Sequence, residues 1–306
     1  MKTLAIDYKM ELGFTGAVTD HCFVLRCIPT ARGCQTVTSR SLEVTPAVPL
    51  FTYRDTFGNF VYRGQCYAPH TAFAFHVNAT VLVHSAEGSR ESCPPFYKYN
   101  TPLTACTDEM RAFLAAVADG TPFSRAVSGR SFERAEVRDF VRLLCAAVHA
   151  RIAYTSGSTT VRTTAAEAFA AQKGVCQDYA HLFVSLAREA GIAARYVCGM
   201  STGEGATHAW AEFFVPDSDR MPQDGQAAQG TWFGVDPTRD KFTDDSYVIL
   251  AVGRDFTDCQ VDRGVFCGSV GQTQTVLVKT TEQDAPDNTG EFSGHRVSST
   301  ADMAGQ

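Results

Sequence analysis

The sequence predicts an α+β protein in which an antiparallel β domain precedes a region of mixed helices and strands. Residues 73–84, FAFHVNATVLVH, carry an apolar side chain at every odd-numbered position, which is typical of a half-buried strand. Residues 133–150 repeat apolar side chains at the three- and four-residue spacing of an amphipathic helix. Strand-like segments follow at 193–200, 208–215, 231–236, 246–252 and 273–279.

The β domain is expected over residues 1–95. Within it, DTFGN at 55–59 lies between aromatic-rich runs and indicates a turn that joins two strands. The segment CPPFYKYNTP at 93–102 contains three prolines and predicts a linker. A second domain is therefore expected over 104–280, followed by a polar tail at 281–306 that we expect to be disordered.

Capping signals mark the helices of the second domain. Thr107 can cap the first of them, and Thr164 with Glu167 forms a capping box for a short helix that ends near residue 174. The next helix starts in the stretch KGVCQDYAHLF, and its apolar residues recur at helical spacing. Gly191 tolerates a left-handed conformation, so it predicts the end of this helix.

Composition and charge exclude several classes of function. The chain is 44% hydrophobic and 20% charged, and its formal net charge of −6 comes with no dense basic run. Binding to nucleic acid is therefore not expected. The N-terminus lacks the apolar core of a signal peptide, and no apolar run reaches the roughly 18–20 residues that span a bilayer. We expect a cytoplasmic protein with no membrane partner.

The cysteines and histidines predict neither a disulfide scaffold nor a metal site. The eleven cysteines are odd in number and scattered, and no CxxC pair of the zinc-knuckle type occurs. His76 and His84 share one strand face, but eight residues of extended strand span about 26 Å, so they cannot share an ion. No metal and no cofactor are predicted.

One cysteine lies where reactivity is favoured. Cys176 comes two residues after Gly174, at the start of a predicted amphipathic helix. Unpaired N–H groups and the positive end of the helix dipole stabilise a thiolate there, and they can bind the oxyanion that forms when a carbonyl is attacked. The alternative is that Cys176 is a buried, inert packing residue, which is the common role of a lone cysteine.

Two segments downstream supply an imidazole and a carboxylate. THAWAEFFVP at 207–216 and GTWFGVDPTRD at 230–240 are strand-like, and an antiparallel hairpin would place His208 beside Asp236. The carboxylate would orient the imidazole, whose other nitrogen would face the thiolate as general base and acid. Taken singly, His208 could be a core histidine and Asp236 a turn residue.

These segments, in this order, resemble the transglutaminase-like superfamily of papain-type fold. AVGRDFTDCQVDRGVFCG at 251–268 is similar to the segment that follows the triad in bacterial transglutaminase-like proteins, and the N-terminal half resembles their preceding β domain. The resemblance covers roughly residues 1–280. It implies a papain-like core in which a helix carrying the nucleophile packs on an antiparallel sheet, and it implies that Cys176, His208 and Asp236 are the catalytic triad.

Five further residues are candidates for the walls of the cleft. Tyr154 and Gln172 lie upstream of the expected nucleophile and are candidates for a second oxyanion donor. His181 lies one helical turn beyond the nucleophile, so it could line the cleft or bond to backbone, and Asp178 could simply interact with the helix dipole. Arg254, in GRDF, could border the substrate or form an internal ion pair.

The expected chemistry is acyl transfer from a peptide or amide bond through a thioester on Cys176. Water as acceptor gives a peptidase or amidase, which we favour because water is always present and no amine site is visible. An amine acceptor gives a protein-glutamine transglutaminase. A non-catalytic module that binds peptides in the same cleft is a third alternative, although it would not need all three side chains. The superfamily's zinc-containing glycopeptide amidases are disfavoured by the missing CxxC pairs. In each case the expected partner is a peptide or protein.

Overall fold

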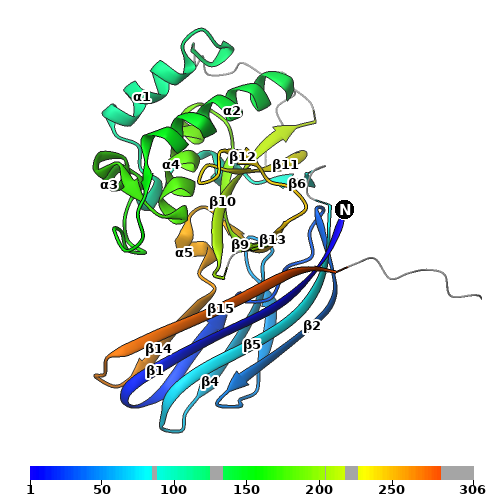
Figure 1. Ribbon diagram of the computed structural model, residues 1–306, viewed down its shortest axis with the longest axis vertical. Coiled ribbons are helices and arrows are strands. Elements are labelled where there is room, and N and C mark those ends of the chain that lie inside the picture. The colour runs from blue at the N-terminus through cyan, green and yellow to red at the C-terminus, as the bar shows by residue number, and fades with distance from the viewer. Residues whose placement is uncertain (85–87, 125–133, 204, 218–226, 284–306) are drawn as a thin grey trace, which may run out of the picture.

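The structure, a computed structural model, describes residues 1–84, 88–124, 134–203, 205–217 and 227–283. These residues form two main antiparallel sheets with a group of helices packed on one of them (Figure 1). The sheet in the lower part of Figure 1 is called the N-terminal sheet below, and the sheet above it, which carries the helices, is called the core sheet. The predicted α+β class is confirmed.

The N-terminal sheet is organised around one very long strand, β1, of 24 residues. The first half of β1 pairs with β5 on one side and β15 on the other, and its second half pairs with β4 and β14. The strands of this sheet are β1 (Lys2–Leu25), β2 (Gln35–Thr45), β3 (Phe51–Arg54), β4 (Phe60–Cys66), β5 (His70–Val83), β14 (Asp262–Cys267) and β15 (Gln272–Gln283).

The alternation in residues 73–84 is confirmed by β5. From Phe73, at 2% exposure, to Val83, at 0%, its odd-numbered side chains are all buried. β5 and the strand that carries His208 belong to different sheets, as expected for two separate domains.

Sheet membership corrects the predicted domain boundaries. We assigned residues 262–280 to the second domain, but β14 and β15 pair with β1 in the N-terminal sheet. Conversely, β6 (Ser89–Cys93) was assigned to the first domain and pairs with β11 in the core sheet. The N-terminal sheet is therefore built from both ends of the described chain. Residues 281–283 of the predicted tail belong to β15, and residues 284–306 lie outside the described residues.

The core sheet has the strand order β12-β11-β10-β9-β13, with β6 added on β11. Its central hairpin is the one that the sequence predicted, with Ala211 opposite Val235 and Phe213 opposite Phe233. A short parallel pair, β7 with β8, lies beside the start of the central helix. The bounds of these strands are β7 (Ala153–Tyr154), β8 (Lys173–Gly174), β9 (Ala194–Ser201), β10 (His208–Pro216), β11 (Ala228–Asp236), β12 (Lys241–Phe242) and β13 (Tyr247–Gly253).

The helices follow the predicted capping signals with one difference. The Thr164–Glu167 capping box is present, but its helix ends at Gln172, which takes the left-handed conformation at φ 54°, rather than near residue 174. Gly191, at φ 82°, ends the helix that starts at Cys176, as predicted. The helices are α1 (Asp108–Ala118), α2 (Arg134–Arg151), α3 (Ala165–Ala171), α4 (Cys176–Glu189) and α5 (Phe256–Cys259), with short 3-10 turns at Pro95–Lys98, Pro102–Thr104 and Pro122–Ser124.

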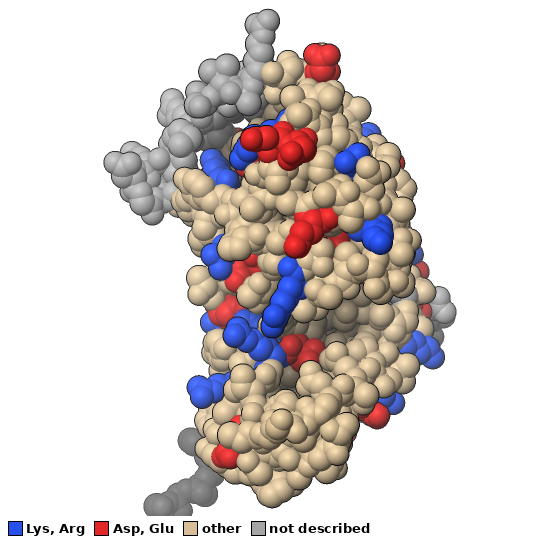
Figure 2. Space-filling view, turned by 90° about the vertical axis from the view of Figure 1, so that its left-hand side faces the viewer, with Lys and Arg blue, Asp and Glu red and all other residues tan. Residues whose placement is uncertain are grey.

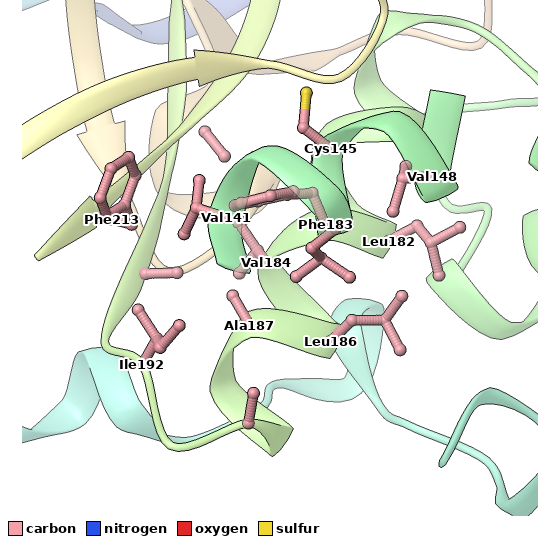
Figure 3. Packing of buried hydrophobic residues seen from close by; sticks show 14 of the residues in the cluster. Val141, Cys145, Val148, Leu182, Phe183, Val184, Leu186, Ala187, Ile192 and Phe213 are labelled. Carbon is pink, nitrogen blue, oxygen red and sulfur yellow. The ribbon is translucent and has the colours of Figure 1, made fainter. Parts of the chain in front are cut away.

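α4 is the central helix of the fold, since every residue from Gln177 to Arg188 is buried. Figure 3 shows α4 against α2 and β10: Leu182 and Phe183 of α4 lie among Val141 and Val148 of α2, and Phe213 of β10 closes the other side. An amphipathic pattern normally indicates one buried face. Here the remaining faces are also covered, so the start of α4 is held in place by the core.

The N-terminal domain is fixed to the edge of the core sheet by two buried amide side chains. Gln35 accepts the N–H of Ile249 at 2.8 Å and donates to its carbonyl at 2.7 Å. Asn59, from the DTFGN turn, does the same with Val252, at 2.8 Å for both bonds. The outer edge of β13 would otherwise present unpaired backbone groups, so these side chains replace a neighbouring strand.

Asn59→Ala is expected to lower the free energy of unfolding by about 2–4 kcal/mol, because it leaves buried backbone groups of Val252 unpaired and removes the acceptor of a charged Arg32 donor. Urea unfolding followed by circular dichroism measures it. Asn78→Ala, at an exposed position of β5, is the matched control and should cost less than about 0.5 kcal/mol. Equal losses in both variants would contradict this account of the domain junction.

Candidate active site

Cys176 is the first residue of α4, and the chain that leads to it is held rigidly. One carboxylate oxygen of Asp178 accepts the N–H of Val175 at 2.7 Å and the hydroxyl of Thr159 at 2.7 Å. A Cβ on Gly174 would lie 2.6 Å from the Cβ of Asp178, so only glycine allows this approach. The half-buried thiol of Cys176 is therefore presented from a fixed helix start.

The predicted juxtaposition of His208 and Asp236 is confirmed. Nε2 of His208 lies 2.8 Å from Oδ2 of Asp236, and the two side chains are 4% and 0% exposed. Cys176 is a further hydrogen-bonding partner of the His208 side chain. One imidazole thus bridges the thiol at the start of α4 and the carboxylate at the end of β11, which are 60 residues apart in the chain.

The surroundings of the pair favour an imidazolium. Burial lowers the pKa of His208, but the hydrogen bond and charge of Asp236 and the hydrogen bond with Cys176 outweigh it and raise that pKa to about 9. Burial raises the pKa of Asp236. This effect is outweighed by the hydrogen bond with His208, the hydroxyl of Tyr247 and the charge of Arg239, so the pKa of Asp236 is lowered overall. At neutral pH the arrangement therefore favours a charged His208–Asp236 pair next to the sulfur of Cys176.

Two residues that the sequence analysis did not single out hold the carboxylate. The hydroxyl of Tyr247 donates to Oδ2 of Asp236 at 2.7 Å, and Arg239 donates to that hydroxyl at 3.1 Å and to Ser201 at 2.7 Å. The backbone N–H of Thr238 donates to the other oxygen, Oδ1, at 2.9 Å. Burial and the charge of Asp236 raise the pKa of Tyr247 well above its usual range, so the hydroxyl stays a donor.

Trp210 covers the imidazole. Its ring stacks on that of His208 at a centroid distance of 6.1 Å and meets Tyr247 edge-on at 5.2 Å. The indole is 1% exposed. It therefore shields the bond between His208 and Asp236 from water, which strengthens the electrostatic interaction of the pair.

Two of the candidate cleft residues are placed in the interior instead. Asp178 is 1% exposed and His181 is 0% exposed, so neither lines a cleft. Asp178 ties the chain before Cys176, as described above. Nε2 of His181 accepts the N–H of Phe256 at 3.1 Å, and burial lowers the pKa of His181 to about 4, so its ring is neutral. Of the two alternatives given for His181, the structure therefore favours the bond to backbone over a place in the cleft, because all faces of α4 are covered.

The guanidinium of Arg254 is paired with a carboxylate and is not an isolated charge at the site. Its Nε lies 2.8 Å from Oδ2 of Asp258, on a side chain that is 46% exposed. The neighbouring Asp255 caps α5 by accepting the N–H of Thr257 at 2.7 Å. Arg188 of α4 donates to the carbonyl of Arg254 at 2.8 Å. The GRDF segment thus fastens α5 to α4, which favours the ion-pair alternative over a substrate contact.

Tyr154 and Gln172 lie near the approach to Cys176. Tyr154 pairs with Gly174 across the β7–β8 ladder and is 57% exposed, and Gln172 is also exposed. Their part as oxyanion donors stays a prediction. Closer donors are the backbone N–H groups of Cys176 and Gln177, which have no intrahelical acceptor because they open α4. The buried Nε2 of Gln177 also has no partner within the described residues.

Figure 2 shows the face on the left of Figure 1. Acidic and basic side chains are interspersed there, and a hollow separates the helical part from the N-terminal sheet below it. Within the described residues, no group of three or more His, Cys, Asp or Glu side chains is arranged to hold a metal ion. In the same part of the chain, no helix is long and apolar enough to cross a membrane.

A helix that starts at a cysteine and packs on an antiparallel sheet carrying His and Asp defines the papain-type class of fold. Family models show which family of this class the chain resembles. The transglutaminase-like superfamily core matches residues 125–237, and the bacterial transglutaminase-like N-terminal region matches residues 4–82. The chain therefore carries a transglutaminase-like core preceded by a bacterial transglutaminase-like N-terminal region, as the sequence resemblance implied.

The chain is also similar to two mycobacterial proteins in sequence and to one solved structure in fold. An uncharacterized protein of Mycobacterium leprae is 29% identical over 84% of this chain and 90% of its own length. An uncharacterized protein of Mycobacterium tuberculosis is 36% identical over 42% of this chain and 41% of its own length. The crystal structure of a proposed cysteine protease from Cytophaga hutchinsonii has the same fold, with a TM-score of 0.67 at 19% identity, covering 93% of this chain and 92% of that chain.

Proposed function

We propose that the protein is a cysteine-dependent acyl-transfer enzyme that hydrolyses peptide or amide bonds. The observation that carries the proposal is the single imidazole of His208, which bonds to Asp236 through Nε2 and also to Cys176. A structural histidine needs one partner for each polar atom. It does not need a thiol at a helix start on one side and a charged, fully buried carboxylate on the other.

In the first half of the reaction, the Cys176 sulfur, as a thiolate whose proton is held on Nδ1 of His208, forms a bond to the carbonyl carbon of the substrate. The carbonyl oxygen gains negative charge, which the N–H groups at the start of α4 can stabilise. Because Nε2 of His208 is bonded to Asp236, Nδ1 is the nitrogen that gives its proton to the leaving amine. The carbon–nitrogen bond breaks, and a thioester remains on Cys176.

In the second half, His208 takes a proton from water through Nδ1, and the water oxygen attacks the thioester carbon. The carbon–sulfur bond breaks, the acid leaves, and the thiolate of Cys176 and the imidazolium of His208 are restored. Asp236 stays ionised throughout, because its lowered pKa keeps it a carboxylate beside the imidazolium. An amine in place of water would give transamidation by the same steps, so product analysis with added cadaverine separates the two.

Brief alkylation with iodoacetamide near pH 6 tests the proposed thiolate–imidazolium pair. Cys176 should react at least about tenfold faster than Cys267, although Cys267 is exposed and Cys176 only half-buried. Interior thiols are protected, since burial raises the pKa of Cys198 to about 12. Peptide mapping measures each rate.

The matched variant for this test is His208→Ala, which should slow Cys176 to the rate of Cys267 because the imidazolium is gone. If Cys176 in the unaltered protein reacts no faster than Cys267, the proposal of an activated nucleophile fails. Rapid labelling that persists in His208→Ala would remove His208 from the activation of the thiol.

A further inference from the structure

A pocket of about 460 Å³ opens where the N-terminal domain meets the core sheet. Its walls come from the β3–β4 turn with Phe57, from β6 with Glu91, from the 3-10 turn with Phe96, and from Arg195 at the start of β9. Cys176, His208 and Asp236 do not line it. Gly199 of β9 pairs with His208, and Arg195 lies four residues before Gly199. Four residues of strand span about 13 Å, which is the distance between Arg195 and Gly199 along β9.

The walls of this pocket are fixed by buried bonds. Oδ1 of Asp55 accepts the N–H groups of Phe57 and Asn59, both at 3.0 Å, and Arg26 pairs with Oδ2 at 2.9 Å. Asn59 in turn is bonded to β13, as described above. A volume of this size with a preformed shape is typical of a site for a small molecule or for one or two residues of a peptide.

The lining carries three guanidinium groups against one carboxylate. Glu91 accepts from Arg32 at 3.1 Å and from Arg195 at 2.9 Å, and burial, which raises its pKa, is outweighed by these two charges, which lower it to about 2. Donors remain after this pairing. Nε of Arg32 and Nη2 of Arg195 are buried with no partner in the described residues.

Arg54 is the guanidinium that a ligand can reach. Its side chain is exposed, and Nη1 donates to the carbonyl of Gly58 at 2.7 Å, which uses one of five donors. Behind it, the charges of Arg32 and Arg195 are balanced by Glu91 and by the buried Glu212, whose Oε2 lies 2.6 Å from Nε of Arg195, so Arg54 supplies the net positive charge of the lining. This part of a protein with net charge −6 therefore favours an anionic group.

The same pocket has an aromatic side. Phe57 and Phe96 meet edge-on with centroids 5.7 Å apart, and Phe96 contacts Tyr97 at 4.6 Å. Phe57 and Phe96 are only partly buried, so part of each ring faces the opening. An apolar group placed there would cover these rings and gain the free energy of removing apolar surface from water.

We propose that this pocket binds a carboxylate attached to an apolar side chain, as at the C-terminal residue of a peptide. Arg54 binds the carboxylate, and the apolar side chain packs on Phe57 and Phe96. The proposal is independent of the catalytic part proposed for Cys176, because none of the three candidate catalytic residues contributes to the pocket.

N-acetyl-L-phenylalanine is the probe, and its binding to the full chain is measured by titration calorimetry. N-acetyl-L-phenylalaninamide lacks only the charge, and N-acetyl-L-alanine lacks only the ring. Each should bind at least about tenfold more weakly, as should the full probe to Arg54→Ala. Arg90→Ala removes an exposed arginine, paired with Asp217, that does not line the pocket, and it should leave binding unchanged.

The catalytic site is tested as an alternative location in the same experiment. Protein alkylated at Cys176 should bind the probe as the free protein does. The proposal is overturned if the acid and the amide bind equally, if Arg54→Ala binds like the unaltered protein, if alkylation of Cys176 abolishes binding, or if no saturable binding is found.

Discussion

Cys176→Ala is expected to lower turnover of a peptide or amide substrate by about 10⁴-fold or more, because no other group can form the thioester. The fold should be kept, since the residue begins α4, is only half-buried, and alanine favours helix. Steady-state hydrolysis rates, compared at matched circular dichroism spectra, measure the effect.

Cys267→Ala is the matched control for this variant. It removes an exposed thiol on β14, in the N-terminal sheet, and should leave turnover within about twofold of the unaltered protein. Full activity in Cys176→Ala would exclude a thioester mechanism. Absence of turnover in the unaltered protein, by contrast, would favour the alternative in which the fold binds peptides without cleaving them.

The parts of the fold that the sequence predicted are those set by local periodicity. The alternation in β5 and the helical spacing in α4 arise because apolar side chains recur at the positions that face the core. Such a repeat can be recognised from residues that are close together in the sequence. The pairing of β15 with β1 joins residues more than 250 positions apart, for example Tyr8 with Val278. No local pattern records such a partner, so both domain boundaries were misplaced.

The candidate site divides in the same way. His208 and Asp236 were predicted to meet because one hairpin brings them together, and that geometry is local to two adjacent strands. Tyr247 reaches Asp236 from β13, which is separated from β11 by two strands of the sheet. The choice between a cleft and a structural role for Asp178 and His181 stayed open, because the pattern of α4 does not reveal that every face of the helix is covered.

The N-terminal domain has a structural part in this arrangement. Gln35 and Asn59 bind the edge of β13, and β13 carries Tyr247, which holds the carboxylate of Asp236. A core sheet without this cover would leave that edge open to water or to another chain. The domain therefore supports the strand on which the orientation of Asp236 depends.

Asp236→Asn is expected to lower turnover by about 10³–10⁴-fold while the fold is kept. Oδ1 of the residue accepts the backbone N–H groups of Thr238 and Arg239, so the oxygen of the new amide is kept on that side. The amide nitrogen then faces Nε2 of His208 and can only donate to it. Nε2 must become the acceptor, the ring proton moves to Nδ1, and Nδ1 can no longer accept a proton from the Cys176 thiol or from water.

The same variant should change the dependence of rate on pH. In the unaltered protein His208 has a pKa of about 9, so the imidazolium that protonates the leaving amine persists below that pH and is lost above it. Activity should therefore fall above about pH 9. The substitution removes the charge and hydrogen bond that raise this pKa and leaves burial, which lowers it, so the alkaline limit should move to lower pH.

Tyr247→Phe separates orientation from charge. It removes one donor to Oδ2 of Asp236 and leaves the carboxylate and its bond with His208, so the loss of turnover should be about tenfold or less. Rate profiles between pH 5 and 10 for the three proteins measure both effects. An unchanged rate and profile in Asp236→Asn would remove Asp236 from the mechanism. A loss in Tyr247→Phe as large as in Asp236→Asn would show that position, rather than charge, is what the carboxylate supplies.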